Sequence, residues 1–333
     1  MSEDAKYTIY RQLKNYQFFV VDGEVYRLNE KLRDLLKEKK LYLIPNPPEN
    51  SKNLATFEKV AQFMIENGMK RSDTLVAVGG GATSDLAGFV ASTLYRGVSW
   101  IVVPTTLLSF IDASIGGKVA INLALGKNLL GSFYQPNEVL FDFDLLKSLP
   151  KREWKSGLGE LSKYAFLDDN IYQLILEGKR EVAYQAAIDY KRDIVSFDFK
   201  ERHQEGLGRS VLNLGHTIGH ALEIQTSLSH GEAVFLGIYL EHEILLGKEQ
   251  FIAFKDRFFQ LKKCLELDLN FDLKLDWSCF FASLSLDKKN DAKVLSFIIV
   301  DPQPKNVKIS KDEFISKSKN SESFRSLFKE DLG

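Results

Sequence analysis

Histidines are concentrated in one short stretch of the chain. Of the five histidines in 333 residues, three are His216, His220 and His230. In a helix, His216 and His220 would share one face, and two neutral imidazoles so placed can bind one divalent metal ion. Arg209 and Asn213 would extend the same polar face, while apolar residues cover the rest of the segment. The pattern predicts a mostly buried helix whose polar stripe lines a cavity and contributes to a metal site.

Such a site needs a third protein ligand from elsewhere in the chain. Catalytic zinc sites commonly combine two imidazoles with one carboxylate. Glu160 is a candidate, and in a helix it would share a face with Lys163. Two alternatives remain open: the stripe could face water with incidental histidines, and Glu160 with Lys163 could form an ordinary surface ion pair.

Three consecutive glycines, at 79–81, follow the strand-like segment 74–78 and precede a helix-like segment. Backbone N–H groups at such a turn can bind a pyrophosphate, helped by the helix dipole. Thr105 and Thr106 follow another strand-like segment, at the end of the sheet where ligands bind in open α/β folds. The pattern indicates a nucleotide site. Because the glycines lack the G-x-G-x-x-G spacing, the alternative is a tight turn that requires glycine.

The segment 109–136 combines glycines with two lysines, Lys118 and Lys127. Ammonium groups beside exposed backbone in an otherwise apolar stretch suggest that both are directed at an anion. The alternative is a glycine-rich surface loop with solvated lysines.

The composition indicates an ordinary globular protein of the cytoplasm. Hydrophobic residues make up 44%, charged residues 27%, and the net charge is −1, which argues against nucleic acid or an anionic membrane as a partner. The two cysteines, Cys264 and Cys279, are too few for a disulfide framework. The start is polar, and no apolar run approaches the roughly 18–20 residues of a membrane span.

Strand-like and helix-like segments alternate as far as Pro150, which predicts an α/β domain. The strand-like segments are 17–20, 41–44, 74–78, 100–103 and 139–143, and the helix-like ones are 29–39, 54–69 and 86–95. From residue 151 the pattern is mostly helical, with a strand-like run at 294–300. We therefore expect two domains, residues 1–150 and 151–333.

Several blocks, taken together and in order, resemble the 3-dehydroquinate synthase family of sugar-phosphate cyclases between about residues 18 and 300. The blocks are VGGGATSDLAGF, YRGVSWIVVPTTLLSFIDASIGGKVAIN, GKNLLGSFYQP, LPKREWKSGLGELSKY, GLGRSVLNLGHTIGHALE and HGEAV. The resemblance implies an amino-terminal NAD-binding domain with a Rossmann-like, mostly parallel sheet. It also implies an all-α carboxy-terminal metal-binding domain and a homodimer.

The resemblance also implies residue roles. The ligands of Zn2+ or Co2+ would be Glu160, His216 and His230, while His220 would contact substrate or transfer protons. The NAD site would be formed by Asp22, Glu49, Lys52, Gly79, Gly80, Gly81, Asp85, Thr105, Thr106, Asp112, Lys118 and Lys127. The substrate contacts would be Asp112, Lys118, Asn128, Lys163, Lys191, Arg209, Asn213 and Lys289, with Arg96 from a neighbouring subunit.

The implied reaction belongs to the shikimate pathway of aromatic amino acid biosynthesis. The family converts 3-deoxy-D-arabino-heptulosonate 7-phosphate into 3-dehydroquinate and phosphate. NAD oxidises the C5 hydroxyl, phosphate is eliminated, NADH returns the hydride, and an intramolecular aldol step closes the ring. Because NAD is regenerated, the enzyme is a carbon–oxygen lyase. Three alternatives remain: a sister sugar-phosphate cyclase, a metal-dependent polyol dehydrogenase and a non-catalytic paralogue.

Overall fold

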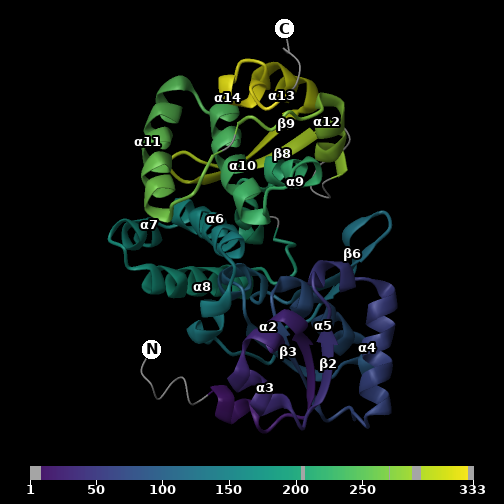
Figure 1. Ribbon diagram of the computed structural model, residues 1–333. Helices are drawn as coiled ribbons and strands as arrows, with labels where there is room; N and C mark the ends of the chain where they lie inside the picture. The colour runs from purple at the N-terminus through teal and green to yellow at the C-terminus, as the bar shows by residue number, and fades with distance from the viewer. Residues whose placement is uncertain (1–8, 204–206, 270, 287–293, 329–333) are drawn as a thin grey trace. The chain divides into compact units, whose positions relative to one another are not determined.

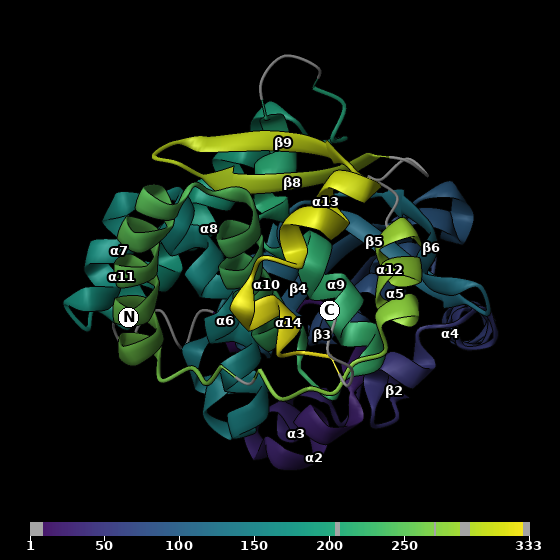
Figure 2. The ribbon, with the colours of Figure 1, turned by 90° about the horizontal axis from the view of Figure 1, so that it is seen from above.

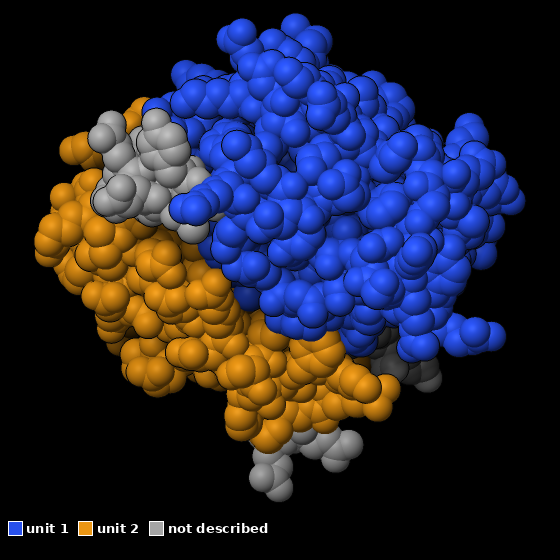
Figure 3. Space-filling view, turned by 90° about the horizontal axis from the view of Figure 1, so that it is seen from below, with its two compact units in different colours: residues 1–154 blue, residues 155–333 orange. Residues whose placement is uncertain are grey.

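The structure is a computed structural model that describes residues 9–203, 207–269, 271–286 and 294–328. The chain forms two compact units, residues 1–154 and 155–333, which are blue and orange in Figure 3. The boundary expected after Pro150 falls immediately before helix α6 (Lys151–Leu167). Within the described residues, no helix is both long enough and apolar enough to cross a membrane.

A five-stranded parallel sheet forms the centre of the first unit, in the order β2-β1-β3-β4-β7. Its strands β2 and β3 are labelled in Figure 1. The strands are β1 (Phe18–Asp22), β2 (Lys40–Ile44), β3 (Thr74–Gly79), β4 (Ser99–Pro104) and β7 (Glu138–Val139). The predicted parallel α/β sheet is thus confirmed. The strand expected at 139–143 is shorter, because the chain turns at Asp142, whose side chain accepts a hydrogen bond from Asp144 N, into the 3-10 helix η4 (Phe143–Ser148).

Helices cover both faces of this sheet because its inner strands are apolar on both sides. Phe18 and Val20 belong to the core on the face of α4 (Leu54–Glu66) and α5 (Gly81–Thr93). Phe19 and Val21 belong to the opposite core, which contains residues of the helical segment 9–13, of α3 and of η4. The remaining helical segments are α2 (Gly23–Leu28), α3 (Glu30–Leu36), η1 (Pro48–Ser51), η2 (Leu94–Arg96) and η3 (Ser109–Ala113).

Much of the lysine- and glycine-rich segment is an antiparallel hairpin, not a loop. Its strands are β5 (Lys118–Leu123) and β6 (Gly126–Phe133). Val119 and Ile121 are buried in the core on the α5 side of the sheet, whereas most of β6 is exposed. The packing of β5 therefore fixes the position of its partner β6, whose first residues include Lys127 and Asn128.

The second unit is mainly helical, as expected, and also contains the hairpin of β8 (Val294–Val300) and β9 (Pro304–Ser310) (Figure 2). The strand-like run at 294–300 is β8. Besides most of α6, its helical segments are α7 (Asp169–Leu176), α8 (Arg180–Phe197), η5 (Gly208–Asn213), α9 (His216–Gln225), α10 (His230–Leu245), α11 (Lys248–Leu265), α12 (Trp277–Leu286), α13 (Lys311–Ser318) and α14 (Glu322–Arg325).

Glycines allow three helices of this unit to meet at their backbones. A Cβ at Gly159 of α6 would lie 2.1 Å from the carbonyl oxygen of Gly231 in α10. A Cβ at Gly237 of α10 would lie 2.1 Å from the carbonyl oxygen of Gly215, just before α9. No larger residue fits either contact without movement of the backbone. The first contact joins residues adjacent to Glu160 and His230.

Candidate metal and cofactor sites

The segment 209–220 is not one continuous helix. The 3-10 helix η5 ends at Asn213, Gly215 adopts a left-handed conformation with φ of +76°, and α9 begins at His216. The prediction that Arg209, Asn213, His216 and His220 form a single helical stripe is therefore wrong. The spacing of the polar residues does not show that Gly215 adopts a positive φ and interrupts the helix.

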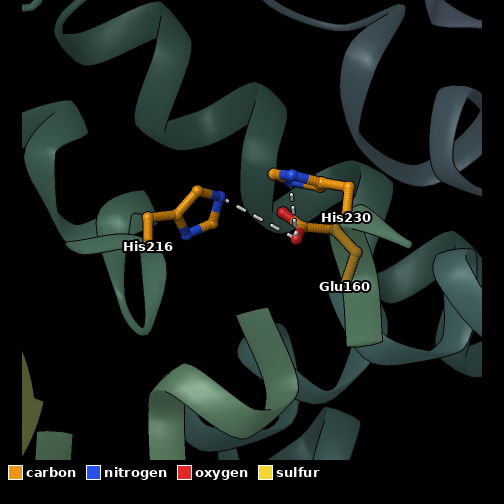
Figure 4. A group of neighbouring side chains, drawn as sticks. All are labelled: Glu160, His216 and His230. Carbon is orange, nitrogen blue, oxygen red and sulfur yellow. Dashed lines mark ion pairs between the residues drawn. The ribbon is translucent and has the colours of Figure 1, made fainter. Parts of the chain in front are cut away.

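Three side chains from three helices converge in the second unit (Figure 4). Glu160 Oε2 lies 3.9 Å from His216 Nε2 and 3.8 Å from His230 Nε2. Glu160 is only 1% exposed, and its other oxygen, Oε1, forms an ion pair with Lys163, which is also 1% exposed. The interpretation of Glu160 and Lys163 as a surface ion pair is thus wrong, because the pair is buried.

The geometry of this group suits a divalent cation. The separations of 3.8 and 3.9 Å are too long for hydrogen bonds. Ligands of a tetrahedral ion with bonds of about 2.0–2.1 Å lie about 3.4 Å apart, so a small inward adjustment is enough. Among the described residues, Glu160 Oε2 has no hydrogen-bond partner although it is buried, which is costly without a compensating cation.

His220 lies outside this group. Its ring centroid is 5.3 Å from that of His216 and 6.0 Å from that of His230. It belongs instead to a second cluster of possible ligand atoms, with Glu223 and His230. The i, i+4 spacing therefore brings His216 and His220 close together without making them joint members of the Glu160 group.

Glu223 is a site residue that the sequence analysis missed. Its Oε2 lies 3.0 Å from His230 Nδ1. The contact closes a turn between the end of α9 and the start of α10, since the two residues are seven apart. An acidic residue close to a candidate histidine ligand was the available signal, but the spacing alone does not distinguish it from a solvated glutamate.

Glu241 is a second missed residue, and it is fully buried. It accepts hydrogen bonds from the backbone N–H groups of Gly215, at 3.1 Å, and Ile218, at 2.9 Å. These N–H groups lie at the start of α9, where His216 is the first residue and where a negative charge is favourable. No sequence signal identified Glu241, because the contact depends on the packing of α9 against α10.

The polar residues before α9 are held by hydrogen bonds to backbone and side-chain groups of the segment 198–201. Arg209 is 4% exposed, and its Nη1 donates a hydrogen bond of 2.8 Å to the Phe199 carbonyl. Asp198 accepts from the backbone N–H of Arg209 at 3.0 Å. Although burial raises the pKa of Asp198, hydrogen bonds from backbone N–H groups lower this pKa overall. Asn213 donates to Glu201 at 3.2 Å.

Lys191 and Lys289 are the other two candidate substrate residues in the second half of the chain. Lys191 of α8 is buried, with 4% exposure. Lys289 lies outside the described residues.

In the first unit, Asp22 and Gly79 lie next to each other at the carboxyl ends of β1 and β3, because Val21 pairs with Val78. The strand order reverses here, which is where open α/β sheets bind ligands. The Asp22 carboxylate caps α2 by accepting from two backbone N–H groups, and burial raises its pKa.

The glycine turn fits a dinucleotide pyrophosphate. Gly80 is the N-cap of α5 and provides no side-chain hydrogen bond, so the helix start presents backbone N–H groups. A Cβ at Gly79 would lie 2.6 Å from the Cβ of Thr83, and one at Gly80 would lie 2.9 Å from Thr106 Cγ2. The buried Thr105 hydroxyl, just beyond β4, has no hydrogen-bond partner among the described residues.

A polar network connects other candidate cofactor and substrate residues of this unit. Buried Lys52 forms an ion pair of 2.6 Å with Asp85 and donates a hydrogen bond to Asn128. Asn122 of the segment 109–136, to which no role was assigned, donates to Glu49 at 2.7 Å and accepts from Asn128 N at 2.9 Å.

The remaining candidates of this unit are less buried. Asp85 and Lys118 line one small hollow, and Gly81 is the first residue of α5. Lys118, Lys127 and Arg96 are exposed, and Asp112 is half-buried in η3.

Comparison with known proteins gives the family. The 3-dehydroquinate synthase N-terminal family matches residues 42–156, and the C-terminal family matches residues 157–290. The 3-dehydroquinate synthase of Alkaliphilus metalliredigens is 40% identical over 273 residues, which cover 77% of this chain and 75% of that protein. That of Clostridium tetani is 34% identical over 336 residues, covering 92% and 88%.

Solved structures share the fold. The chain matches 2-deoxy-scyllo-inosose synthase complexed with carbaglucose-6-phosphate, NAD+ and Co2+ at 26% identity and a TM-score of 0.76, covering 90% of this chain and 89% of that one. It matches 2-epi-5-epi-valiolone synthase from Streptomyces hygroscopicus at 22% identity and a TM-score of 0.73, covering 91% and 89%. With family matches over residues 42–290 and such relatives over most of its length, the chain belongs to the 3-dehydroquinate synthase family.

Proposed function

We propose that the chain is a 3-dehydroquinate synthase, which converts 3-deoxy-D-arabino-heptulosonate 7-phosphate into 3-dehydroquinate and phosphate. The relatives that match most of the chain bear this name. The observation that carries the proposal within the molecule is the convergence of Glu160 Oε2, His216 Nε2 and His230 Nε2.

NAD and one divalent metal ion, Zn2+ or Co2+, are the proposed cofactors. Support comes from the glycine turn and the Glu160 group, and from the related inosose synthase structure with NAD+ and Co2+. When bound, NAD supplies a hydride acceptor and the ion supplies Lewis-acid polarisation of a substrate oxygen. Glu160, His216 and His230 would hold the ion.

The chain's own residues would bind and orient a substrate with one carboxylate and one phosphate. Lys163, Lys191 and Arg209 provide positive charge in the second unit, and all three are buried. Buried cations bind anions strongly because little water competes. His220, close to His216 and His230, is the proposed proton-transfer or substrate-contacting residue.

In the first unit, Lys118 and Asn128 belong to the β5–β6 hairpin and Asp112 to η3. We assign them to substrate binding beside NAD. Residues 1–150 would form the NAD-binding domain and residues 151–333 the metal- and substrate-binding domain of a cytoplasmic homodimer.

The decisive experiment measures phosphate release from the heptulosonate phosphate by the purified chain with NAD and Zn2+ or Co2+. We expect release with formation of dehydroquinate, and loss of both on chelation. Glu160→Ala and His230→Ala should abolish metal binding and turnover, because each removes one of three proposed ligands. A full metal content in either variant would contradict the ligand assignment.

A second candidate function is supported by the inosose synthase match, since that protein shares the fold at 26% identity. Cyclisation of a hexose phosphate, with no turnover of the heptulosonate phosphate, would favour it. Net production of NADH from a polyol would instead indicate a dehydrogenase, because the proposed reaction returns the hydride. Bound NAD and metal with no turnover of any of these compounds would indicate a non-catalytic paralogue.

A further inference from the structure

We propose that Glu223 is a positioning residue that fixes the tautomer and orientation of His230 for metal binding. The inference deepens the proposed function, since it rests on His230 as a ligand. Glu223 lies in the last turn of α9, and His230 is the first residue of α10. Glu223 can position His230 in this way without binding the metal ion itself.

The two nitrogens of His230 face two different carboxylates. Nδ1 lies 3.0 Å from Glu223 Oε2, and Nε2 lies 3.8 Å from Glu160 Oε2. A carboxylate can only accept, so the short contact requires the proton on Nδ1. In the neutral ring Nε2 then presents its lone pair toward the Glu160 group.

Burial makes this contact effective. The side chains of His230 and Glu223 are 28% and 20% exposed, so water competes only partly for the hydrogen bond. A carboxylate that accepts a hydrogen bond from the N–H of a ligand histidine also raises the basicity of the ring nitrogen that binds the metal. Such outer partners typically change metal affinity by about 10- to 100-fold when they are replaced.

The two proposed histidine ligands are held by different contacts, although they lie close together in the chain. His216 begins α9, which ends just after Glu223, and His230 follows a short connection. The His216 ring is fixed independently, since its Nδ1 lies 3.0 Å from the Leu214 carbonyl. Replacing Glu223 should therefore disturb one ligand and leave the other in place.

A competing interpretation makes Glu223 a ligand of a separate ion, because Glu223, His220 and His230 also offer ligand atoms near one another. The short Glu223–His230 contact argues against it, since it occupies Nδ1 while Nε2 faces Glu160. Metal stoichiometry distinguishes the two interpretations.

The test uses the purified full chain, stripped of metal and titrated with Zn2+ against a chromophoric chelator at constant pH. The wild type should bind one ion. Glu223→Gln, which keeps the size but removes the charge, should bind it about 10- to 100-fold more weakly, and Glu223→Ala at least as weakly. The matched control is Glu232→Gln, because Glu232 caps α10 through Ser229 and a glutamine can keep that cap. Its affinity should match that of the wild type, because the cap of α10 is kept.

A second measurement separates positioning from general damage to the fold. If Glu223 acts on the metal site through His230, Glu223→Gln should weaken Zn2+ binding while the urea midpoint of the metal-free protein stays that of the wild type. The Co2+ absorption spectrum should change in Glu223→Gln and not in Glu232→Gln.

Wild-type affinity in both Glu223 variants would overturn the inference while leaving the proposed function intact. Two ions in the wild type and one in Glu223→Gln would also overturn it, in favour of a second site. A clearly lowered urea midpoint of the metal-free Glu223→Gln protein would do the same, since it would indicate general damage to the fold. A wild type that binds no ion would contradict the metal requirement of the proposed function itself.

Discussion

Glu160 and Lys163 form a buried ion pair one turn apart on α6. Burying a carboxylate is expensive, and here the ammonium group neutralises it while one oxygen stays directed at two imidazoles. The pair thus keeps a proposed metal ligand buried before any ion binds. Its stability effect should depend on whether the ion is present.

We predict that Lys163→Met lowers the free energy of unfolding of the metal-free protein by about 3–5 kcal/mol, because it leaves Glu160 unpaired. Added Zn2+ should recover part of the loss, since the ion compensates the same charge and binds only the folded chain. Urea unfolding with and without Zn2+ measures both effects. The control is Lys155→Met on the same helix, whose partner Asp268 is 77% exposed, and it should cost at most about 1 kcal/mol. Equal losses in both variants would contradict the prediction.

His242 is a buried histidine with a structural role. Its Nδ1 donates to the Ile238 carbonyl at 2.7 Å, its Nε2 accepts from Val300 N at 2.9 Å, and its ring stacks on Phe254. Burial lowers the pKa of His242 to about 4. The ring is therefore neutral in the native state, and protonation would break its hydrogen bond from β8.

This lowered pKa predicts a specific loss of stability in acid. Between pH 6.5 and about 4 the unfolded state binds a proton at His242 that the folded state does not, so stability falls as the pH decreases through this window. By about pH 4 this protonation of the unfolded state lowers the free energy of unfolding by about 3 kcal/mol. Above pH 6.5 it has no effect on stability. His242→Gln keeps a donor and an acceptor but does not titrate. Urea unfolding at pH 7.5 and 4.5 should show a smaller acid loss in the variant; the same loss in both proteins would argue against His242.

At the scale of elements, the sequence predicted the strands and helices that have a periodic pattern. It missed a single backbone break and the contacts between side chains of different elements. Apolar runs such as Val76–Val78, buried on both faces, indicated the parallel strands, and the resulting sheet places Asp22 beside Gly79. The break at Gly215 was missed because the polar residues on either side kept a helical spacing. Glu223 and Glu241 were missed because their partners lie on another helix or across a turn.

The crossing of α6 and α10 shows why a ligand set can depend on residues that bind nothing. Gly159 precedes Glu160, Gly231 follows His230, and a Cβ at Gly231 would lie 1.7 Å from the Ser156 carbonyl oxygen. The two glycines allow the backbones to approach and bring both side chains to one point. A methyl group at either position must push the helices apart.

Gly159→Ala should therefore weaken Zn2+ binding and lower the free energy of unfolding by about 1–3 kcal/mol, the usual cost of overpacking. Chelator competition and urea unfolding measure the two effects. Gly247→Ala is the matched control, because there the nearest atom belongs to the flexible side chain of Gln250. Unchanged Zn2+ affinity in Gly159→Ala would show that the close approach does not set the ligand positions.

At the scale of the whole molecule, the two units carry different proposed ligands. The residues assigned to NAD lie in the first unit, including Gly79 and Lys52, and the Glu160 group lies in the second. The two binding reactions should therefore be separable, with NAD affinity unchanged in Glu160→Ala. The proposed turnover needs both, so a relative supports the same activity when its match covers both units, as that of Clostridium tetani does over 92% of this chain.

Arg96 is the proposed residue that acts on the neighbouring subunit of a homodimer. It is exposed, and both it and Tyr95 adopt left-handed conformations, with φ of 65° and 51°. Such strain in non-glycine residues is often kept at functional positions. Arg96→Ala should weaken substrate binding and leave NAD affinity unchanged, because it removes a cation proposed to contact the substrate phosphate.

Subunit mixing tests whether Arg96 acts across the dimer. Arg96→Ala, assayed at low substrate concentration, and Glu160→Ala should each show little activity. In a mixed dimer, the site with intact Glu160 receives an intact Arg96 from its partner, while the other site lacks both residues. Random mixing makes half of the dimers mixed, each with one complete site of two, so about one quarter of wild-type activity should return. If Arg96 served its own subunit, no mixed dimer would contain a complete site, and differently tagged mixed dimers would stay as inactive as their parents. Sedimentation of the wild type only as a monomer would also rule out the cross-subunit role.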